Sequence, residues 1–198
     1  MMHPSTELKP VNPQIGNGVF ATAFIPAGTI VYVKCSLDIE IAPDSPLLND
    51  PAYKDILEKY SYTDSTGYLV LCWDLGKYVN HCCHFNTIST AYGCDIAFRD
   101  IQPGEELTSE YALFTFDRDM ELTCHYPDCR KRLTPQDFDH YWPLWDASAR
   151  QAIDRLPEVE QPLLKYLDPA ALADLQAFLD THQGYRSLQQ LRPDRRLL

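Results

Sequence analysis

Residues 14 to 118 consist of short runs of β-branched and aromatic residues, separated every few positions by glycine or proline. The clearest pair is 18–25 and 29–33, which the sequence Pro-Ala-Gly separates. Such runs predict short strands joined by tight turns. Further strands are expected at 37–41, 67–73, 89–92, 95–99 and 107–111, with one short helix at 51–60. This half of the chain is therefore predicted to be mainly β.

Beyond Pro135 the spacing of apolar residues becomes helical, and prolines stand near the expected helix ends. Helices are predicted at 147–155, 157–167 and 169–179. Five apolar residues of the last helix share one face, which is expected to dock on the rest of the protein: Ala171, Leu172, Leu175, Phe178 and Leu179. A peptide-binding or dimerisation face is the alternative.

A chain of 198 residues with 45% hydrophobic and 23% charged residues can form one substantial hydrophobic core. Its formal net charge is −11. Binding to a nucleic-acid backbone needs clustered lysine and arginine, so no direct nucleic-acid binding is expected. A basic protein partner suits this charge better, although acidity that serves only solubility is an equally good interpretation.

The chain has seven cysteines, and its N-terminus lacks both the basic and the apolar region of a signal peptide. These features predict an intracellular, reducing location, where thiols pack, react or bind metal more often than they form disulfides. They do not distinguish the cytoplasm from the nucleus. No run approaches the roughly 18 apolar residues of a membrane span, so no membrane association is expected.

Residues 16–21 (Gly-Asn-Gly-Val-Phe-Ala) formally satisfy the Gly-x-Gly-x-x-Ala dinucleotide fingerprint. That fingerprint has to follow a strand and begin a helix, whereas Pro13 precedes this segment and Pro26 and Gly28 follow it. The segment is therefore interpreted as a glycine-rich turn into a strand, where missing side chains let the backbone approach a ligand. A purely structural turn is the alternative.

Residues 80–86 (Asn-His-Cys-Cys-His-Phe-Asn) concentrate polar and metal-binding side chains directly after a strand-like aromatic segment. Taken singly, each histidine is more often structural and each cysteine a small buried hydrophobe. Together, His81, Cys82, Cys83 and His84 allow a metal-dependent or cysteine-based hydrolase, which alkylation of Cys82 would inactivate. Their spacing does not match the hydrolase signatures considered.

Two further segments follow. Residues 97–111 are expected to form a strand, a Pro-Gly turn and a second strand that ends in Tyr111. Cys124 and Cys129 are separated by four residues, which is compatible with metal binding but supplies only half of a tetrahedral zinc site.

The order and spacing of these segments resemble the SET-domain family of protein lysine methyltransferases. Residues 16–21 look like its opening Gly-x-Gly motif and residues 80–86 like its Asn-His-Ser-Cys-x-Pro-Asn motif. Residues 104–111 (Gly-Glu-Glu-Leu-Thr-Ser-Glu-Tyr) look like Gly-Glu-Glu-Leu-x-x-Asp-Tyr, and residues 124–130 resemble the cysteine-rich post-SET segment. The resemblance covers residues 14–132 and leaves the helical tail uncovered.

This resemblance implies a mainly β SET-type fold of several small sheets with a knot-like C-terminal motif, followed by an α-helical C-terminal appendage. The implied division is a SET-like catalytic domain at 1–118, a post-SET-like cysteine segment at 119–133 and a helical C-terminal region at 134–198. The implied activity is methyl transfer from S-adenosylmethionine to a lysine side chain of a protein substrate, most simply a basic one.

The resemblance also assigns roles to residues of this sequence. Tyr111 is the implied catalytic tyrosine. The implied cofactor-binding residues are Gly16, Asn17, Gly18, Val19, Asn80, His81 and Tyr111. Candidates for the substrate channel or the adenine face are Tyr68, Tyr78, Tyr92, Phe114 and Phe116.

Ser109 stands two residues before the implied catalytic tyrosine, where the family commonly has Phe or Tyr. A smaller side chain there predicts room for an amine that already bears methyl groups, and hence di- or trimethyl-lysine as a product. The alternative is that Ser109 faces away from the channel or that Tyr92 or Phe114 fills the space.

Four positions depart from the family motifs: Cys82, Phe85 and Glu110 replace Ser, Pro and Asp, and Leu122 replaces a post-SET cysteine. The first three changes affect packing or hydrogen bonding. The fourth leaves three implied zinc ligands, which are Cys83, Cys124 and Cys129. His125 is a candidate for the fourth, and zinc binding is left open because a closed structural site normally has four ligands.

A catalytically inactive SET-like protein-interaction module is the main alternative, because a fold alone does not establish activity. Its working surface would be the helical tail. Against it stands the presence of all five of the motif residues Gly16, Gly18, Asn80, His81 and Tyr111.

Overall fold

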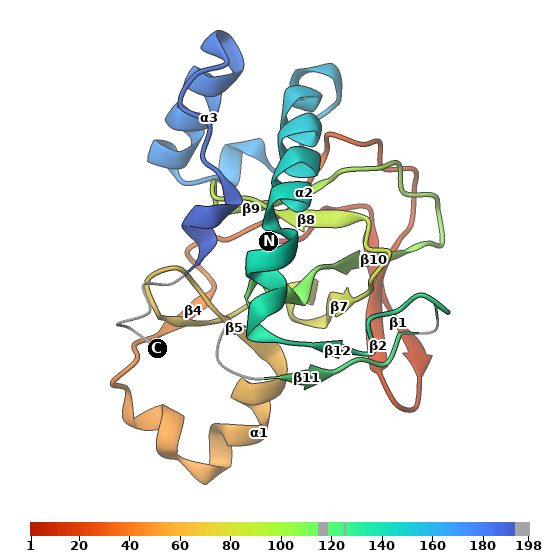
Figure 1. The fold of residues 1–198 in the computed structure, drawn as a ribbon, viewed down its shortest axis with the longest axis vertical. Helices are drawn as coiled ribbons and strands as arrows, with labels where there is room; N and C mark the ends of the chain where they lie inside the picture. The colour runs from red at the N-terminus through yellow and green to blue at the C-terminus, as the bar shows by residue number, and fades with distance from the viewer. Residues whose placement is uncertain (115–118, 125, 193–198) are drawn as a thin grey trace.

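The computed structural model describes residues 1–114, 119–124 and 126–192. Within these residues the strands form four small sheets (Figure 1), ordered β1-β2-β10-β7, β3-β9-β8, β4-β6-β5 and β11-β12. The strands are β1 (Thr6–Asn12), β2 (Gly16–Ala21), β3 (Ile30–Val33), β4 (Ile39–Ile41), β5 (Ser61–Thr63), β6 (Leu69–Leu71), β7 (Asn80–His81), β8 (Thr87–Ser89), β9 (Cys94–Ala97), β10 (Glu106–Ser109), β11 (Met120–Glu121) and β12 (Arg132–Leu133).

Three α-helices accompany the sheets: α1 (Pro51–Tyr60), α2 (Pro135–Asp154) and α3 (Pro169–Thr181). In Figure 1, α1 and α3 lie at opposite ends of the molecule, with α2 between them. Short 3-10 turns connect the elements: η1 (Pro46–Asn49), η2 (Leu75–Tyr78), η3 (Tyr111–Leu113), η4 (Leu156–Glu158), η5 (Leu164–Tyr166) and η6 (Leu188–Leu191).

The three sequence motifs meet in the first sheet. Strand β10 pairs antiparallel with β2, placing Leu107 opposite Val19, and parallel with β7, placing Ser109 opposite His81. A parallel pair needs a crossover connection, and here the chain between β7 and β10 forms β8 and β9 of a different sheet. The expected SET-type arrangement of several small sheets is therefore confirmed.

The main core lies between the sheet β3-β9-β8 and the helical region. Ile30, Ile88 and Ile96 of the sheet are fully buried in the same cluster as residues of α2 and α3. The helical members of that cluster include Phe138, Trp145, Ala149, Ile153, Ala171, Leu175 and Phe178. The docking face predicted for α3 is confirmed, and the helical region shares one core with the β-region instead of forming its own.

Some predicted elements were wrong. Helix α2 begins at Pro135, well before the expected residue 147, because Thr134 and Asp137 form a capping box and Pro143 is accommodated inside the helix. The segment 157–167 forms the short turns η4 and η5 and no α-helix. Pro157 and Pro162 interrupt it, since proline cannot donate a helical hydrogen bond.

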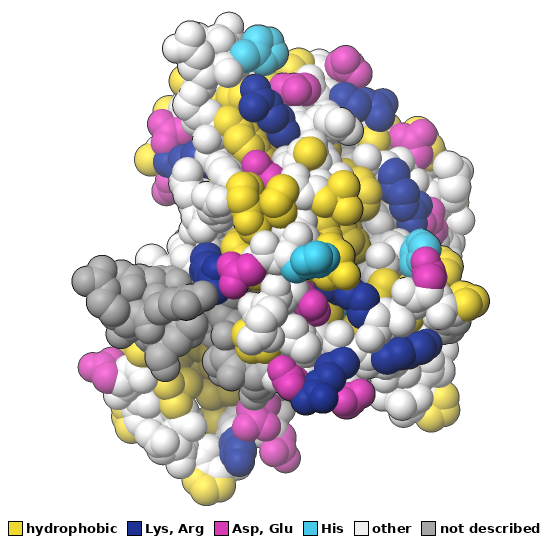
Figure 2. Space-filling model, viewed as in Figure 1, with side chains coloured by type: hydrophobic (Ala, Val, Ile, Leu, Met, Phe, Trp, Pro, Cys, Tyr) yellow, Lys and Arg dark blue, Asp and Glu magenta, His cyan; other side chains and the backbone are white. Residues whose placement is uncertain are grey.

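Strand β1 was not predicted. It pairs with β2 along its whole length, but it lies at the edge of its sheet and is largely exposed, so its composition is polar. On the surface seen in Figure 2, acidic and basic side chains are interspersed, while hydrophobic side chains gather over α2. None of the described helices is long and apolar enough to cross a membrane.

Candidate active site

The side-chain amide of Asn80 joins the glycine-rich segment to the third motif. Its Nδ2 donates to the carbonyl oxygen of Asn17 at 3.0 Å and to Oε1 of Glu106 at 2.8 Å. A Cβ at position 18 would collide with Glu106 and lie 3.0 Å from Nδ2 of Asn80. Gly18 is therefore required for the close approach of β2 to these two side chains.

Position 16 requires glycine for a different reason, which is its backbone conformation. Its φ angle is +91°, and nothing lies within 4 Å of the place that a Cβ would occupy. The turn before β2 thus presents bare backbone to open space beside Asn17, as expected of a segment that a ligand approaches. Val19, the last residue assigned to cofactor binding in this segment, is fully buried in the second hydrophobic cluster.

His81 connects β7 to the residue that ends the third motif. Its side chain is 5% exposed, and burial together with the charge of Arg130 lowers its pKa to about 3. The neutral ring accepts a hydrogen bond at Nδ1 from the backbone N–H of Tyr111 at 3.2 Å. This contact explains how the Asn-His motif positions Tyr111.

The hydroxyl group of Tyr111 donates to the carbonyl oxygen of Val79 at 2.7 Å. Burial raises the pKa of this phenol above its ordinary value, and the negative charge of Glu106 raises it further. The hydroxyl is therefore protonated at neutral pH and is held at a fixed position by the strand end that precedes Asn80.

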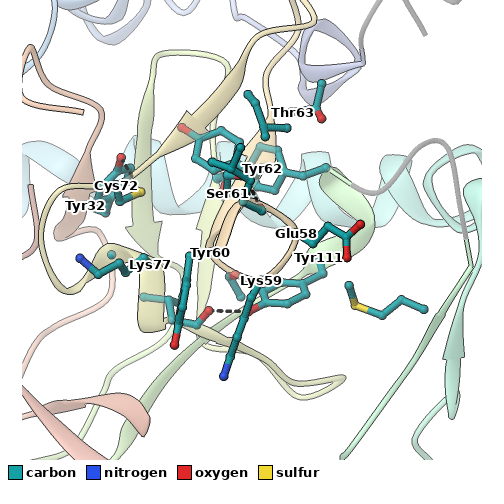
Figure 3. A pocket seen from close by; sticks show the side chains of 18 of the residues that line it. Tyr32, Glu58, Lys59, Tyr60, Ser61, Tyr62, Thr63, Cys72, Lys77 and Tyr111 are labelled. Carbon is teal, nitrogen blue, oxygen red and sulfur yellow. Dashed lines mark hydrogen bonds between the residues drawn. The ribbon is translucent and has the colours of Figure 1, made fainter. Parts of the chain in front are cut away.

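Tyr111 lies on the wall of a cavity of about 330 Å³ between α1, β5 and the sheet β3-β9-β8. Figure 3 shows Tyr60, Tyr62 and Tyr111 around it, with Glu58 and Lys59 of α1 nearby. Two of the predicted channel residues, Ser109 and Phe114, line the same cavity. Further lining residues are Tyr32, Leu57, Cys72, Lys77, Val79, Ser89, Asp95 and Met120.

The structure does not bring the other predicted channel residues to this cavity. Tyr92 is 1% exposed in the main core, where its hydroxyl accepts the backbone N–H of Arg186 at 3.0 Å. Tyr68 is 38% exposed and does not line the cavity, and Tyr78 packs edge-on against Tyr60 with the ring centroids 5.4 Å apart. Phe116 lies outside the described residues.

The comparison with protein-family models agrees with this geometry. Residues 16–112 match the family model of the SET domain. This chain is a SET-domain protein. The match begins at the first glycine of β2 and ends just after Tyr111, so it includes the glycine-rich segment, Asn80, His81 and Tyr111.

Two solved structures are similar to this SET-domain chain. One is the crystal structure of KRYPTONITE in complex with mCHG DNA and SAH, at 19% identity and a TM-score of 0.44, covering 62% of this chain and 28% of that one. The other is the putative histone methyltransferase PFL0690c of Plasmodium falciparum, at 18% identity and a TM-score of 0.41, covering 56% and 95%. The comparison with curated proteins gives no match.

Three thiols gather beside the SET-domain motifs. The Sγ atoms of Cys83, Cys124 and Cys129 all lie within 4.8 Å of one another. Cys82 approaches Cys124 at 4.0 Å, and Nε2 of His81 lies 3.6 Å from Cys83. The three predicted ligands are thus brought together, whereas His125 lies outside the described residues.

The protonation of these thiols differs. Burial raises the pKa of Cys124, but hydrogen bonds from the backbone N–H groups of Cys83 and Tyr126 and from neighbouring thiols outweigh it, so the pKa is lowered. Burial raises the pKa of Cys82 to about 12 and also raises that of Cys83. Cys82 is therefore a protonated, buried thiol, which argues against the cysteine-hydrolase alternative.

Arg130 ties the cysteine segment to both the SET domain and α2. Its guanidinium forms an ion pair with Glu110, which is 1% exposed, and lies 3.4 Å from Asp137. It also packs over the rings of Tyr141 and Trp145 at 5.2 and 5.8 Å. Glu110 was noted in the sequence only as a departure from the family motif, and its partner Arg130 was not predicted.

Proposed function

We propose that this SET-domain protein transfers methyl groups from S-adenosylmethionine to the lysine side-chain amine of a protein substrate. The observation that supports this most directly is the position of Tyr111. Its hydroxyl is fixed by Val79 on the wall of an aromatic cavity, while its backbone is held by His81 of the Asn-His motif.

The cofactor supplies an electrophilic methyl group, and the protein has to present a neutral amine to it in line. A free lysine has a pKa of about 10.4 and is mostly protonated at neutral pH. Aromatic walls such as those of Tyr60, Tyr62 and Phe114 make a buried ammonium costly, which lowers the pKa of an entering lysine. The hydroxyl oxygen of Tyr111, whose proton is donated to Val79, can accept a hydrogen bond from the amine and orient it beside the donor, while the aromatic walls exclude water.

The residues that would hold the cofactor fit this assignment. Gly16 and Asn17 present open backbone, and Asn80 fixes that backbone from the other motif. His81 is buried and neutral, so it adds no positive charge beside a sulfonium. The sulfur cluster also suits zinc, because a thiol of lowered pKa and two neighbours at short range are the donors that zinc prefers.

The proposed substrate is a basic, lysine-bearing protein segment. The net charge of −11 favours encounter with such a segment. Charges of both signs are interspersed on the face seen in Figure 2, so the attraction is not confined to one acidic patch on that face. The proposed location is intracellular, in keeping with seven free cysteines.

A titration with S-adenosylmethionine separates this proposal from the inactive interaction module. We expect saturable binding by calorimetry at micromolar to millimolar cofactor, and weaker binding when Gly18 is replaced by Ala, since the added Cβ meets Glu106 and Asn80. Gly104→Ala serves as the control for destabilisation alone, because that glycine has open space around it but a φ angle of +81°, which strains any residue with a Cβ. No binding at millimolar cofactor would favour the interaction module.

A further inference from the structure

The inner wall of the cavity carries a carboxylate that the methyl-transfer scheme does not use. Successive side chains of a strand point to opposite faces of a sheet. In β9, Cys94 and Ile96 therefore face the core beneath α2, and Asp95 faces the cavity. Asp95 retains partial exposure because it borders this space, although the protein surrounds it.

The surroundings of Asp95 leave its charge uncompensated at close range. Burial raises its pKa to about 6, against a hydrogen bond from Ser89 and the distant N-terminal amine, which lower it. It is therefore mainly ionised at pH 7.5. Among the described residues no lysine, arginine or histidine forms an ion pair with it. The cavity lysines, Lys54, Lys59 and Lys77, belong to α1 and η2 and not to this wall.

Aromatic rings complete the inner cavity. Tyr32 stands opposite Asp95 in the adjacent strand, and Tyr62 packs on Phe114 with ring centroids 4.8 Å apart. All three rings line the space that Asp95 borders. Burial raises the pKa of both Tyr32 and Tyr62, so both phenols stay protonated and carry no charge. A carboxylate with aromatic walls suits a weakly hydrated cation, which gains from ring faces and from the negative charge.

Ser109 joins this inner space to the catalytic tyrosine. It is 7% exposed, lies on the same cavity as Tyr111 and Asp95, and contributes only a small side chain. The small side chain of Ser109 therefore leaves room in this shared cavity for an amine nitrogen that bears methyl groups.

We propose that Asp95, Tyr32 and Tyr62 form a methylammonium-binding subsite that retains partly methylated lysine between transfers. The retained form is the ammonium, so it releases its proton to solvent and reacts beside Tyr111 as the neutral amine when the next methyl group is added. This inference rests on the proposed function and names the preferred substrate of that site. A methylated ammonium loses less hydration than a bare one on entry, so the subsite favours mono- and dimethyl-lysine over unmodified lysine.

Tetramethylammonium is a probe of this subsite that needs no turnover. We expect it to bind the full chain in an NMR titration at pH 7.5, and Asp95→Asn to weaken that binding about tenfold. Asp55→Asn is the matched control, because Asp55 is an exposed carboxylate of α1 that does not line the cavity. Equal weakening by both substitutions, or by neither, overturns the subsite.

A second measurement uses the unaltered protein and does not depend on the folding of a variant. Tetramethylammonium affinity should fall as the pH is lowered from 7 to 5, because Asp95 becomes protonated. The other titratable groups near it are Tyr32, Tyr62, Cys72, Asp38 and the N-terminal amine, and Glu58, Lys54, Lys59 and Lys77 line the same cavity from α1 and η2. Burial raises the pKa of Tyr32, Tyr62 and Cys72, so these three stay neutral throughout this range. Affinity that stays constant across this range overturns the proposal.

The product distribution then links the subsite to turnover. With a lysine peptide, the wild type should proceed beyond monomethyl-lysine, while Asp95→Asn should accumulate the monomethyl product. Active protein that does not bind tetramethylammonium contradicts this inference alone. Inactive protein that binds the probe contradicts the proposed function and leaves the subsite standing.

Discussion

Asn80 links the two halves of the proposed cofactor site through one side-chain amide. Its contacts with the Asn17 carbonyl and with Glu106 hold the glycine-rich turn against β10. Both acceptors are at least partly exposed, so the loss of their donor should cost about 1 kcal/mol, less than for a fully buried group. Single side chains such as that of Asn80 therefore determine whether the glycine-rich turn already has a ligand-binding conformation before the ligand arrives.

Replacing Asn80 with Ala should weaken S-adenosylmethionine binding by up to about tenfold, because the Asn17 carbonyl and Glu106 lose their donor. Calorimetry measures the affinity. Asn49→Ala, at an exposed position of η1, is the control for loss of an asparagine. Unchanged affinity in Asn80→Ala would remove this residue from the site.

Ser109 sets the width of the cavity next to Tyr111. Replacing it with Tyr adds an aromatic ring to a buried position that borders the cavity. We expect the product on a lysine peptide to become restricted to the monomethyl form, which a mass-spectrometric time course records. The prediction would be refuted by a wild type that makes only monomethyl-lysine and a variant that does the same.

At the scale of elements, the short segment between β11 and β12 connects all parts of the molecule. It carries Cys124 and Cys129, which meet Cys83 of the SET domain, and Arg130, which meets Glu110 and α2. This segment is too short to have a core of its own. Its position depends on the sulfur cluster, on the ion pair of Arg130 with Glu110, on the pairing of β11 with β12 and on the contact of His84 with Asp128 at 2.8 Å.

If the sulfur cluster binds zinc, the purified protein should contain about one metal per chain, and Cys124→Ser should lose it. Elemental analysis measures the metal, and limited proteolysis reports whether residues 119–133 loosen on chelation. Cys35→Ser is the control, since Cys35 lies outside the cluster. Metal-free protein with full activity would mean that Leu122 marks a lost site and that packing alone holds the segment.

Replacing Arg130 with Ala should lower the free energy of unfolding by about 3 kcal/mol, because it leaves the buried Glu110 carboxylate without its partner. Urea denaturation measures the free energy of unfolding. Arg132→Ala is a control in the same segment, since the ion pair of Arg132 with Asp119 is exposed and should be worth less than about 1 kcal/mol.

A second variant separates the ion pair from the packing of the arginine. Burial raises the pKa of Glu110 in spite of Arg130, so the charged form is costly to bury. Arg130→Met with Glu110→Gln should therefore recover much of the lost stability. Equal losses for Arg130→Ala and Arg132→Ala would contradict the structural role assigned to Arg130.

At the scale of the whole molecule, the resemblance carried by the order and spacing of the motifs was enough to predict the SET fold, the approach of Asn17 and Gly18 to Asn80, and the meeting of Cys83, Cys124 and Cys129. These features depend on contacts within a motif or on the order of the motifs along the chain. The cavity walls could not be predicted, because Tyr60, Tyr62 and Asp95 reach Tyr111 only through the placement of α1 and the small sheets. Tyr92 was misplaced for the same reason: a strand-like aromatic packs in whichever core the sheet covers.

The role of Tyr111 is where the sequence motif, the hydrogen bonds and the cavity converge. The most direct measurement is transfer of radiolabelled methyl groups from S-adenosylmethionine to a lysate of the source cells, by the wild type and by Tyr111→Phe. That change removes one hydroxyl and its bond to Val79, so folding and cofactor affinity should be nearly retained.

We predict labelled protein with the wild type, label that survives as methyl-lysine on hydrolysis, and a loss of at least about a hundredfold in rate with Tyr111→Phe, equivalent to roughly 2.7 kcal/mol of transition-state stabilisation. Cofactor binding without any labelled lysine, or equal labelling by both proteins, would contradict the assignment of this cavity as a lysine methyltransferase site.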